Sequence, residues 1–579
     1  MLKKILKNIL AFIIFNLKIV YCVAIFFIIS LIILSKSSLK SNQKPVISNY
    51  KYVVFDIDKV KEENNPTLAF FNDDNINFNT VINSLNNIRL NKNVEALIIN
   101  LDTLRLSPSQ IEEFMKILKK FPMSNKKIYA YGSNIDNVTY RLASVADKIV
   151  MPNTLSARLS LNGYYSNQLY FKDIFDKYGV KVEAIHVGSH KSFGEQYYLN
   201  KMSDELRSDL TRVFDDRLNN FALNISKNRK LDINTFKNNI LDGKYDSISP
   251  YTAKDYGLID EIMDYDMLME KLNATDDNTI SLSDIAQQDM ENNSKNTIAI
   301  VPLEGNITSS NEDLSDLTLS EKNVRNKFEQ IEKNKNIKAV ILRINSPGGS
   351  ALEAEMIHKL IKRYTDTYHI PIYASLSDVA ASGGYYIATS AKKIFANEAT
   401  ITGSIGVVSL LPKFDKAFNK FNINSQVIQK GKYAGIYDPS YSLTDDDRTH
   451  LQSILQDVYT EFKHRVSVAR NIPDEKLEPL AGGRIWLGDE AKNIGLIDDI
   501  ASLDEVIDIV AKECNLTDYN VTQINTKMDY SNYLDFAKSI FNSNTKLDIY
   551  DNIYKKLLFI QNNSLTPLYF NTSLNKLKY

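Results

Sequence analysis

The sequence predicts an α/β protein built from two copies of one domain, each with a mostly parallel sheet covered by helices. Two observations predict this fold: three blocks of sequence recur in the same order, and short apolar runs alternate with helical stretches. A chain of 579 residues is long enough for two or more domains. Its apolar content of 44% and charged content of 24% are those of a globular protein.

The repeat consists of three matched pairs of segments. They are NKNVEALIINLD (91–102) with NKNIKAVILRIN (334–345), residues 128–154 with 372–400, and AKDYGLIDEI (253–262) with AKNIGLIDDI (491–500). The pairs keep one order and nearly one spacing along the chain. They therefore indicate a tandem duplication.

Within each copy the pattern alternates between strand and helix. VEALIINL (94–101) and IKAVILRI (337–344) are short apolar runs that fit strands buried on both faces. Residues 352–364 fit a helix with one apolar face, made of Leu352, Met356, Ile357, Leu360 and Ile361. PIYASL (371–376) is again a strand, and GGYYIATSA (383–391) a helix. This alternation predicts a mostly parallel sheet in each copy.

The domain boundaries follow from the repeat and from composition. We expect an N-terminal membrane anchor, a first domain, a polar linker, a second domain and a tail that matches neither copy and looks helical. Their ranges are 1–45, 46–274, 275–296, 297–525 and 526–579.

The anchor is predicted from an uncharged run over residues 19–34. Extended back past Lys18, the run is long enough to cross a hydrocarbon core of about 30 Å as one helix. No small-residue cleavage site follows it, so we expect it to stay attached. Lysines before the run favour a cytoplasmic N-terminus and an outward-facing catalytic part, whereas Lys36, Lys40 and Lys44 after it weaken that orientation.

Several kinds of site are not expected. A net charge of -1 gives no reason to expect nucleic acid as a partner. Cys22 and Cys514 are the only cysteines, so neither a disulfide framework nor a thiolate metal site is expected. His186 and His190 have the spacing of zinc ligands but lack an adjacent glutamate. We therefore expect no metal and no organic cofactor.

Three glycine-rich stretches of the second copy point to chemistry: NSPGGS (345–350), VAASGGYY (379–386) and TGSIGV (402–407). Ser382 follows a predicted strand at the start of a helix, where backbone N–H groups favour a developing oxyanion. Gly383 beside it, and Gly348 and Gly349 at another strand end, leave room for a substrate backbone and free N–H groups.

A serine nucleophile needs a base. Each histidine fits a surface or packing position better than a catalytic one, and no G-x-S-x-G elbow is present. A lysine can serve if burial lowers its pKa from about 10.4 to near neutral. Residue chemistry alone selects none of the many lysines.

At these stretches the chain resembles the long form of signal peptide peptidase A, the bacterial protease IV, of the Clp protease–crotonase superfamily. The resemblance implies a Clp protease/crotonase-like domain in each copy and a Ser/Lys dyad. It implies Ser382 as nucleophile and Lys191, in GSHKS (188–192), as general base. It further implies that Ser404 orients the lysine and that Gly348 or Gly349 donates to the oxyanion.

The repeat tests this assignment independently. Alignment of the two copies places Asn137 opposite Ser382 and Ala434 opposite Lys191. The first copy therefore lacks the serine and the second copy lacks the lysine. This predicts a single site at the interface between the domains. Lys432, two positions from the equivalent of Lys191, and His190 remain alternative bases.

The resemblance implies a function and a setting. It implies a membrane-anchored serine endopeptidase that degrades cleaved signal peptides and other hydrophobic peptides through an acyl-enzyme. It also implies a homotetramer in the bacterial inner membrane, single-pass, with the catalytic part in the periplasm. The alternatives are a crotonase-like enzyme acting on acyl-CoA thioesters and a catalytically silent membrane scaffold.

Overall fold

The computed structural model describes residues 47–58, 60–63, 76–286, 294–309, 318–526 and 568–570. The chain divides into two compact units, 1–49 and 50–579, and of the first only the short helix η1 (Ile47–Asn49) is described. The predicted anchor over 1–45 lies outside the described residues. None of the helices in the described ranges is both long and apolar enough to cross a membrane.

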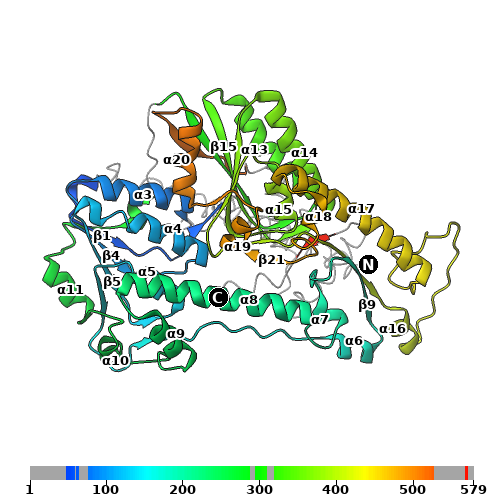
Figure 1. The fold of residues 1–579 in the computed structure, drawn as a ribbon, viewed down its shortest axis with the longest axis horizontal. Coiled ribbons are helices and arrows are strands. Elements are labelled where there is room, and N and C mark those ends of the chain that lie inside the picture. The colour runs from blue at the N-terminus through cyan, green and yellow to red at the C-terminus, as the bar shows by residue number, and fades with distance from the viewer. Residues whose placement is uncertain are drawn as a thin grey trace, which may run out of the picture. The chain divides into compact units, whose positions relative to one another are not determined.

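Two parallel sheets with equivalent strand orders form the centres of the two repeats (Figure 1). The first has the order β10-β7-β5-β4-β1-β11, with strands β1 (Tyr52–Phe55), β4 (Ala96–Asn100), β5 (Lys127–Tyr131), β7 (Lys148–Met151), β10 (Glu261–Ile262) and β11 (Thr279–Ser281). The second has the order β22-β18-β17-β15-β12-β23, with strands β12 (Thr297–Glu304), β15 (Ile337–Ser346), β17 (Ile372–Ala381), β18 (Ile394–Ala396), β22 (Asp499–Ile500) and β23 (Asn520–Gln523). The predicted duplication of a mostly parallel α/β domain is confirmed.

The helices also correspond pairwise. Those of the first repeat are α3 (Phe78–Leu90), α4 (Pro108–Leu118), α5 (Asn137–Ala143), α6 (Lys172–Tyr178), α8 (Asp204–Arg229), α9 (Ile233–Leu241), α10 (Pro250–Asp255) and α11 (Tyr265–Leu272). Those of the second are α13 (Glu321–Lys333), α14 (Ala351–Tyr368), α15 (Gly383–Ala388), α16 (Asp415–Lys420), α17 (Asp445–Arg470), α18 (Asp474–Leu477), α19 (Gly488–Asn493) and α20 (Leu503–Glu513). The longest pair, α8 and α17, have 26 residues each and begin after hydroxyl N-caps, Ser203 and Thr444. The short helices η2 (Pro122–Ser124), α7 (Glu195–Tyr198) and α12 (Leu282–Ala286) complete the described set.

Two tyrosines fix the alignment of the repeats at the site. The hydroxyl of Tyr140 in α5 donates to the carbonyl of Leu258 at 2.8 Å, and that of Tyr385 in α15 donates to the carbonyl of Leu496 at 2.6 Å. The two pairs occupy equivalent places in their repeats. The alignment that sets Asn137 opposite Ser382 therefore has a structural basis.

Two details differ from the sequence expectations. On α14, Ile357, Leu360 and Ile361 are buried as predicted, but Leu352 and Met356 are exposed, so the apolar face assigned to this helix was too wide. The stretch 275–296, expected to be a linker, contains regular structure. Its strand β11 pairs with β1 in the first sheet, and the helix α12 follows. β11 is the edge strand of the first sheet.

A third sheet mixes segments from distant parts of the chain, in the order β14-β13-β16-β24-β20-β9. Its strands are β9 (Lys181–Val187), β13 (Asn306–Ile307), β14 (Thr318–Leu319), β16 (Gly348–Ser350), β20 (Val407–Lys413) and β24 (Leu568–Phe570). β9 belongs to the first repeat, yet it pairs antiparallel with β20 of the second along seven residues. A helical tail was expected over residues 526–579. Beyond residue 526, the described residues of this tail form the strand β24, and the others lie outside the described residues.

The remaining short strands form two small sheets and a branch of the second central sheet. In the first repeat β2 (Val60–Lys61) pairs with β3 (Ile76–Asn77), and β6 (Asn134–Ile135) with β8 (Arg158–Leu159). In the second, β19 (Ile401–Gly403) pairs parallel with the end of β17, and β21 (Ile485–Leu487) pairs antiparallel with β19, so both belong to the eight-stranded second sheet. Helix α8 of the first repeat packs against β21, next to these strand ends (Figure 1).

Candidate active site

Ser382 lies at the turn between β17 and α15, where it is the N-cap of the helix. Its backbone has φ 55° and ψ -120°, a conformation that costs energy for a residue with a side chain. The N–H of Ser382 donates to the carbonyl of Gly403 at 2.8 Å, which holds the turn in place. The side chain is fully buried at the junction of the repeats.

Lys191 reaches this serine from the other repeat. It lies just after β9, and the pairing of β9 with β20 carries it into the second repeat. Its Nζ is 2.7 Å from Oγ of Ser382, 2.9 Å from the carbonyl oxygen of Ser404 and 3.1 Å from Oγ of Ser404. The structure therefore brings together the three side chains that the sequence singled out as nucleophile, base and orienting residue.

The environment of Lys191 favours its neutral form. The residue is 1% exposed, and burial lowers the pKa of its ammonium well below the usual range of lysine. A neutral amine has a lone pair that can accept the proton of the Ser382 hydroxyl. The contact can thus activate the serine as a nucleophile.

Backbone contacts fix the position of Ser404 next to Lys191. It has φ 51°, and its N–H donates to the carbonyl of Arg484 at 2.7 Å. This turn points both its carbonyl and its hydroxyl at Lys191. Two acceptors on one side of the amine fix its position relative to Ser382.

Gly482 and Gly483, which the sequence analysis did not single out, pack against the loop that contains Lys191. The N–H of His190 donates to the carbonyl of Gly482 at 2.8 Å, and the backbone of Lys191 packs directly on Gly483. Gly483 has φ 89°, and a Cβ there would overlap the backbone nitrogen of Lys191. The Gly-Gly step in AGGR (481–484) was the available signal, but it reads equally well as a simple turn.

The predicted oxyanion glycines lie on two elements that contact each other, the strand β16 and the helix α15 that begins after Ser382. Gly349 has φ 151°, and a side chain there would overlap the carbonyl of Ile307 in β13, so only glycine fits this close approach. Gly348 is the first residue of β16, which packs against α15. Gly383 is the first residue of α15, where helical N–H groups have no intrahelical acceptor. The N–H of Gly348 donates to Oγ of Ser346 at 3.2 Å, so the start of α15 at Gly383 is the place where backbone donors lie next to Ser382.

A segment of the chain itself lies along this site. β24 runs antiparallel to β16, with Tyr569 opposite Gly349, and also pairs with β20 at Val408. An extended backbone therefore fits between β16 and β20, next to the helix α15 that follows Ser382.

The two alternative bases do not contact Ser382. Lys432 is exposed and pairs with Asp446 at 2.7 Å. The ring of His190 is turned away, with Nδ1 3.0 Å from Asp209 and Nε2 2.8 Å from a guanidinium nitrogen of Arg484. Only Lys191 among these three lies at the serine.

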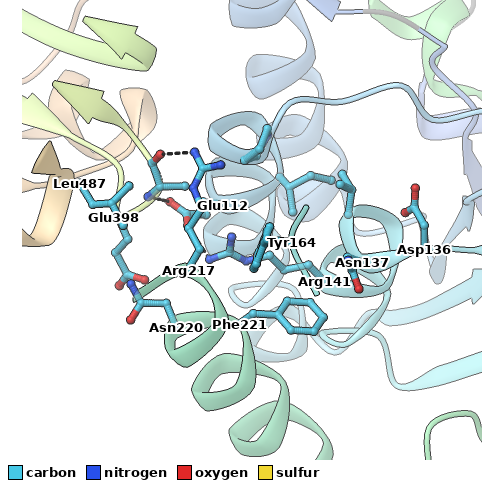
Figure 2. A pocket seen from close by; sticks show the side chains of 14 residues that line it. Glu112, Asp136, Asn137, Arg141, Tyr164, Arg217, Asn220, Phe221, Glu398 and Leu487 are labelled. Atoms are coloured by element: carbon cyan, nitrogen blue, oxygen red, sulfur yellow. Dashed lines mark hydrogen bonds and ion pairs between the residues drawn. The ribbon is translucent and has the colours of Figure 1, made fainter. Parts of the chain in front are cut away.

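The equivalent place in the first repeat holds a cavity of about 150 Å³ (Figure 2). Asn137, opposite Ser382 in the alignment, lines it, and its side-chain amide donates to the carbonyl of Gly163 at 2.8 Å. Arg141 and Glu112 form an ion pair in its wall. The cavity has neither a serine nor a lysine in its lining, so the residues at this place do not form a second Ser/Lys pair.

In the described ranges, no group of three or more His, Cys, Asp or Glu side chains is placed to hold a metal ion. His358, one of the histidines, is buried and packs edge-on against Tyr386 with ring centroids 5.3 Å apart. Its burial lowers its pKa to about 3, as for a neutral packing residue.

The family assignment follows from the sequence as a whole. The model of Peptidase family S49 matches residues 120–278 and 365–517, one match in each repeat. The chain belongs to Peptidase family S49. This confirms the resemblance noted from the glycine-rich stretches and from GSHKS.

Similar proteins span several organisms. The chain is 29% identical to "Serine protease SPPA, chloroplastic" of Arabidopsis thaliana over 73% of this chain and 64% of that protein. It is 29% identical to "Protease 4" of Haemophilus influenzae over 67% and 65% of the two chains, and 26% identical to "Protease 4" of Salmonella typhi over 79% and 75%. It thus matches just under two thirds of the length of the first two relatives. A solved ClpP1 mutant from Listeria monocytogenes matches 36% of this chain and 94% of its own at 15% identity, with a TM-score of 0.23.

Proposed function

We propose that this protein is a serine peptidase in which Ser382 attacks a peptide carbonyl and Lys191 is the general base. The observation that carries the proposal is the 2.7 Å contact between Lys191 Nζ and Ser382 Oγ, in a place where burial lowers the pKa of the lysine. Membership in Peptidase family S49 supports it.

The mechanism uses groups already in place. Neutral Lys191 takes the hydroxyl proton as Oγ of Ser382 bonds to the carbonyl carbon, and backbone N–H groups near Gly349 and Gly383 stabilise the oxyanion. The amine then leaves with the proton from Lys191, which gives an acyl-enzyme. Water, deprotonated by Lys191, hydrolyses that ester and restores the serine. Ser404 keeps the lysine aligned through both steps.

The substrate class is an extended peptide. The position of β24 supports this, since a strand pairs with both β16 and β20 beside the serine. An acyl-CoA thioester would make no use of two strand edges. Within this class we propose cleaved signal peptides and other hydrophobic peptides, in keeping with the resemblance of the site motifs to signal peptide peptidase A.

The setting is part of the same proposal. The apolar run over 19–34 would anchor the chain in the bacterial inner membrane by a single pass, with the catalytic part on the periplasmic side. The duplicated domains would have the Clp protease/crotonase-like fold. Four copies would assemble as a homotetramer.

The test is peptide hydrolysis by the full-length protein in detergent. Ser382→Ala should abolish hydrolysis and labelling by a serine-reactive probe, whereas Ser208→Ala, at an exposed position on α8, should change neither. Unchanged thioester turnover in Ser382→Ala would favour the crotonase-like alternative. Failure of the probe to label Ser382 in the intact protein would favour a silent scaffold.

A further inference from the structure

The first repeat has a cavity at the place where the second repeat has its serine. Asn137, opposite Ser382 in the alignment of the repeats, lines this cavity at the start of α5. In the second repeat an extended segment, β24, contacts the equivalent helix α15. The duplicated fold therefore puts the cavity at the counterpart of a surface that holds an extended backbone.

Most of the surface that lines the cavity is apolar. Its walls come from α4, α5 and α8 of the first repeat and from two segments of the second (Figure 2). The apolar side chains are Pro108, Ile111, Val138, Phe221, Ala399 and Leu487. A cavity of about 150 Å³ lined by such side chains can hold a benzene ring. At about 150 Å³, this cavity has space for one leucine or phenylalanine side chain.

Two polar atoms of the lining residues are buried without a hydrogen-bond partner in the described part of the chain, Nε of Arg141 and Oδ1 of Asn137. The rest of each side chain is already engaged, Arg141 with Glu112 and the amide nitrogen of Asn137 with the carbonyl of Gly163 at 2.8 Å. Because Asn137 and Arg141 are four residues apart in α5, they lie on one face of it. A buried donor or acceptor without a partner costs free energy, so binding of a ligand that supplies both partners is favoured.

The charges of the lining favour a neutral ligand. Arg141 and Arg217 share the lining with Glu112, Asp136 and Glu398, which leaves no excess of positive charge for a carboxylate or a phosphate. An extended peptide residue is neutral and presents its N–H and its C=O on the same side. Its N–H can donate to an amide oxygen, and its C=O can accept from a guanidinium.

We infer that the cavity binds one apolar residue of an extended peptide, with the N–H of that residue donating to Oδ1 of Asn137 and its C=O accepting from Nε of Arg141. The side chain of the bound residue fills the space between α5 and α8. The lining has neither a serine nor a lysine, so the peptide is held there without being cut. This second peptide site goes beyond the proposed hydrolysis at Ser382 and does not rest on it.

Photo-cross-linking tests the site in the full-length protein, with Ser382→Ala to prevent cleavage. The probe is acetyl-Gly-photoleucine-Gly-amide, in which photoleucine is the one large apolar residue, and mass spectrometry maps the positions that it labels. We expect labels on cavity side chains such as Val138 and Phe221, and a loss of about 10-fold or more in Val138→Trp, because the indole fills the space. No label in the cavity, with or without label around Ser382, would overturn the inference.

Leu223→Trp, at an exposed position on α8 outside the lining, is the matched control for this variant. It should leave labelling of the cavity within about twofold, since surface substitutions have small effects. Equal loss of label in Val138→Trp and Leu223→Trp would contradict the inference.

A change in the probe tests the hydrogen bonds without changing the cavity. Methylation of the photoleucine nitrogen removes the proton that is donated to Asn137, so labelling of the cavity should fall by about 10-fold. Methylation of the nitrogen of the first glycine keeps that proton and is the control. Equal labelling by the two methylated probes would show that the cavity takes up any apolar group of the right size, which contradicts its assignment as a peptide site.

Discussion

Arg343 of the second repeat donates two hydrogen bonds to the carboxylate of Glu62 in the first, at 3.0 and 2.9 Å. It also donates to Glu113 of the first repeat at 2.7 Å. Burial alone would lower the pKa of this arginine, but the carboxylates of Glu113 and Glu62 raise it, so it stays charged in the interior. The repeats are therefore joined by a buried ionic cluster as well as by the β9–β20 ladder.

Arg343→Met should destabilise the protein by about 3–5 kcal/mol, because it leaves two buried carboxylates without their partner. Denaturant unfolding, followed by fluorescence, measures the change. The exposed pair of Lys172 with Asp176 is the control, and Lys172→Met should cost less than about 1 kcal/mol. A loss as small as the control's would mean that the cluster does not hold the repeats together.

Ser382→Gly should raise the stability relative to Ser382→Ala. The positive φ of this position is unfavourable for any side chain but not for glycine, so a gain of about 1 kcal/mol is expected. Both variants should lack peptidase activity. Thermal unfolding of the two, side by side, makes the comparison, and equal stabilities would show that the turn is not strained.

The rate of peptide hydrolysis should rise with pH through the lowered pKa of Lys191. Below that pKa the amine is protonated and cannot accept the serine proton; above it the base is free. A profile of kcat/KM against pH measures it. We expect the midpoint of the rise in kcat/KM to lie at a pH well below the usual pKa of lysine. Activity confined to pH values near about 10.4, the ordinary lysine pKa, would contradict the account.

His190 is expected to act as a positioning residue for Lys191. Its ring lies between Asp209 of α8 and Arg484, whose carbonyl also holds Ser404. His190→Ala should lower kcat by about 10- to 100-fold while changing KM little, since a small displacement of a catalytic group is costly.

The exposed His186 provides the control for this prediction, and His186→Ala should leave kcat within about twofold. His190→Asn, which can still pair with Asp209, should recover part of the lost rate. A rise in KM with unchanged kcat in His190→Ala would indicate a role in substrate binding instead.

Much of the fold was predictable because it is local and repeated. The apolar runs 94–101 and 337–344 became central strands, and the repeat predicted equivalent sheets. The exchange of β9 into the second repeat was not predictable, since strand pairing over more than 200 residues depends on tertiary packing rather than on the pattern of either segment. Leu352 was misassigned because helical periodicity alone does not say how wide the buried face is.

The parts of the candidate site that lie in glycine-rich stretches could be predicted from the sequence. Ser382 was singled out by its glycine-rich stretch. The roles of Ser404 and Lys191 were implied by the resemblance to signal peptide peptidase A, and the repeat supported the choice of Lys191. Asp209 and Arg484 were not predicted, because charged residues on a helix and after a turn are usually solvated. Their contacts arise only when the two repeats meet around His190.

The central claim is that Lys191 of the first repeat is the base for Ser382 of the second. The most direct measurement is peptide hydrolysis by Lys191→Ala beside Lys432→Ala, in full-length protein with folding checked by circular dichroism. We predict that Lys191→Ala loses hydrolysis by at least about 1000-fold and that Lys432→Ala keeps it, because only Lys191 contacts the serine. Full activity in Lys191→Ala would contradict the account.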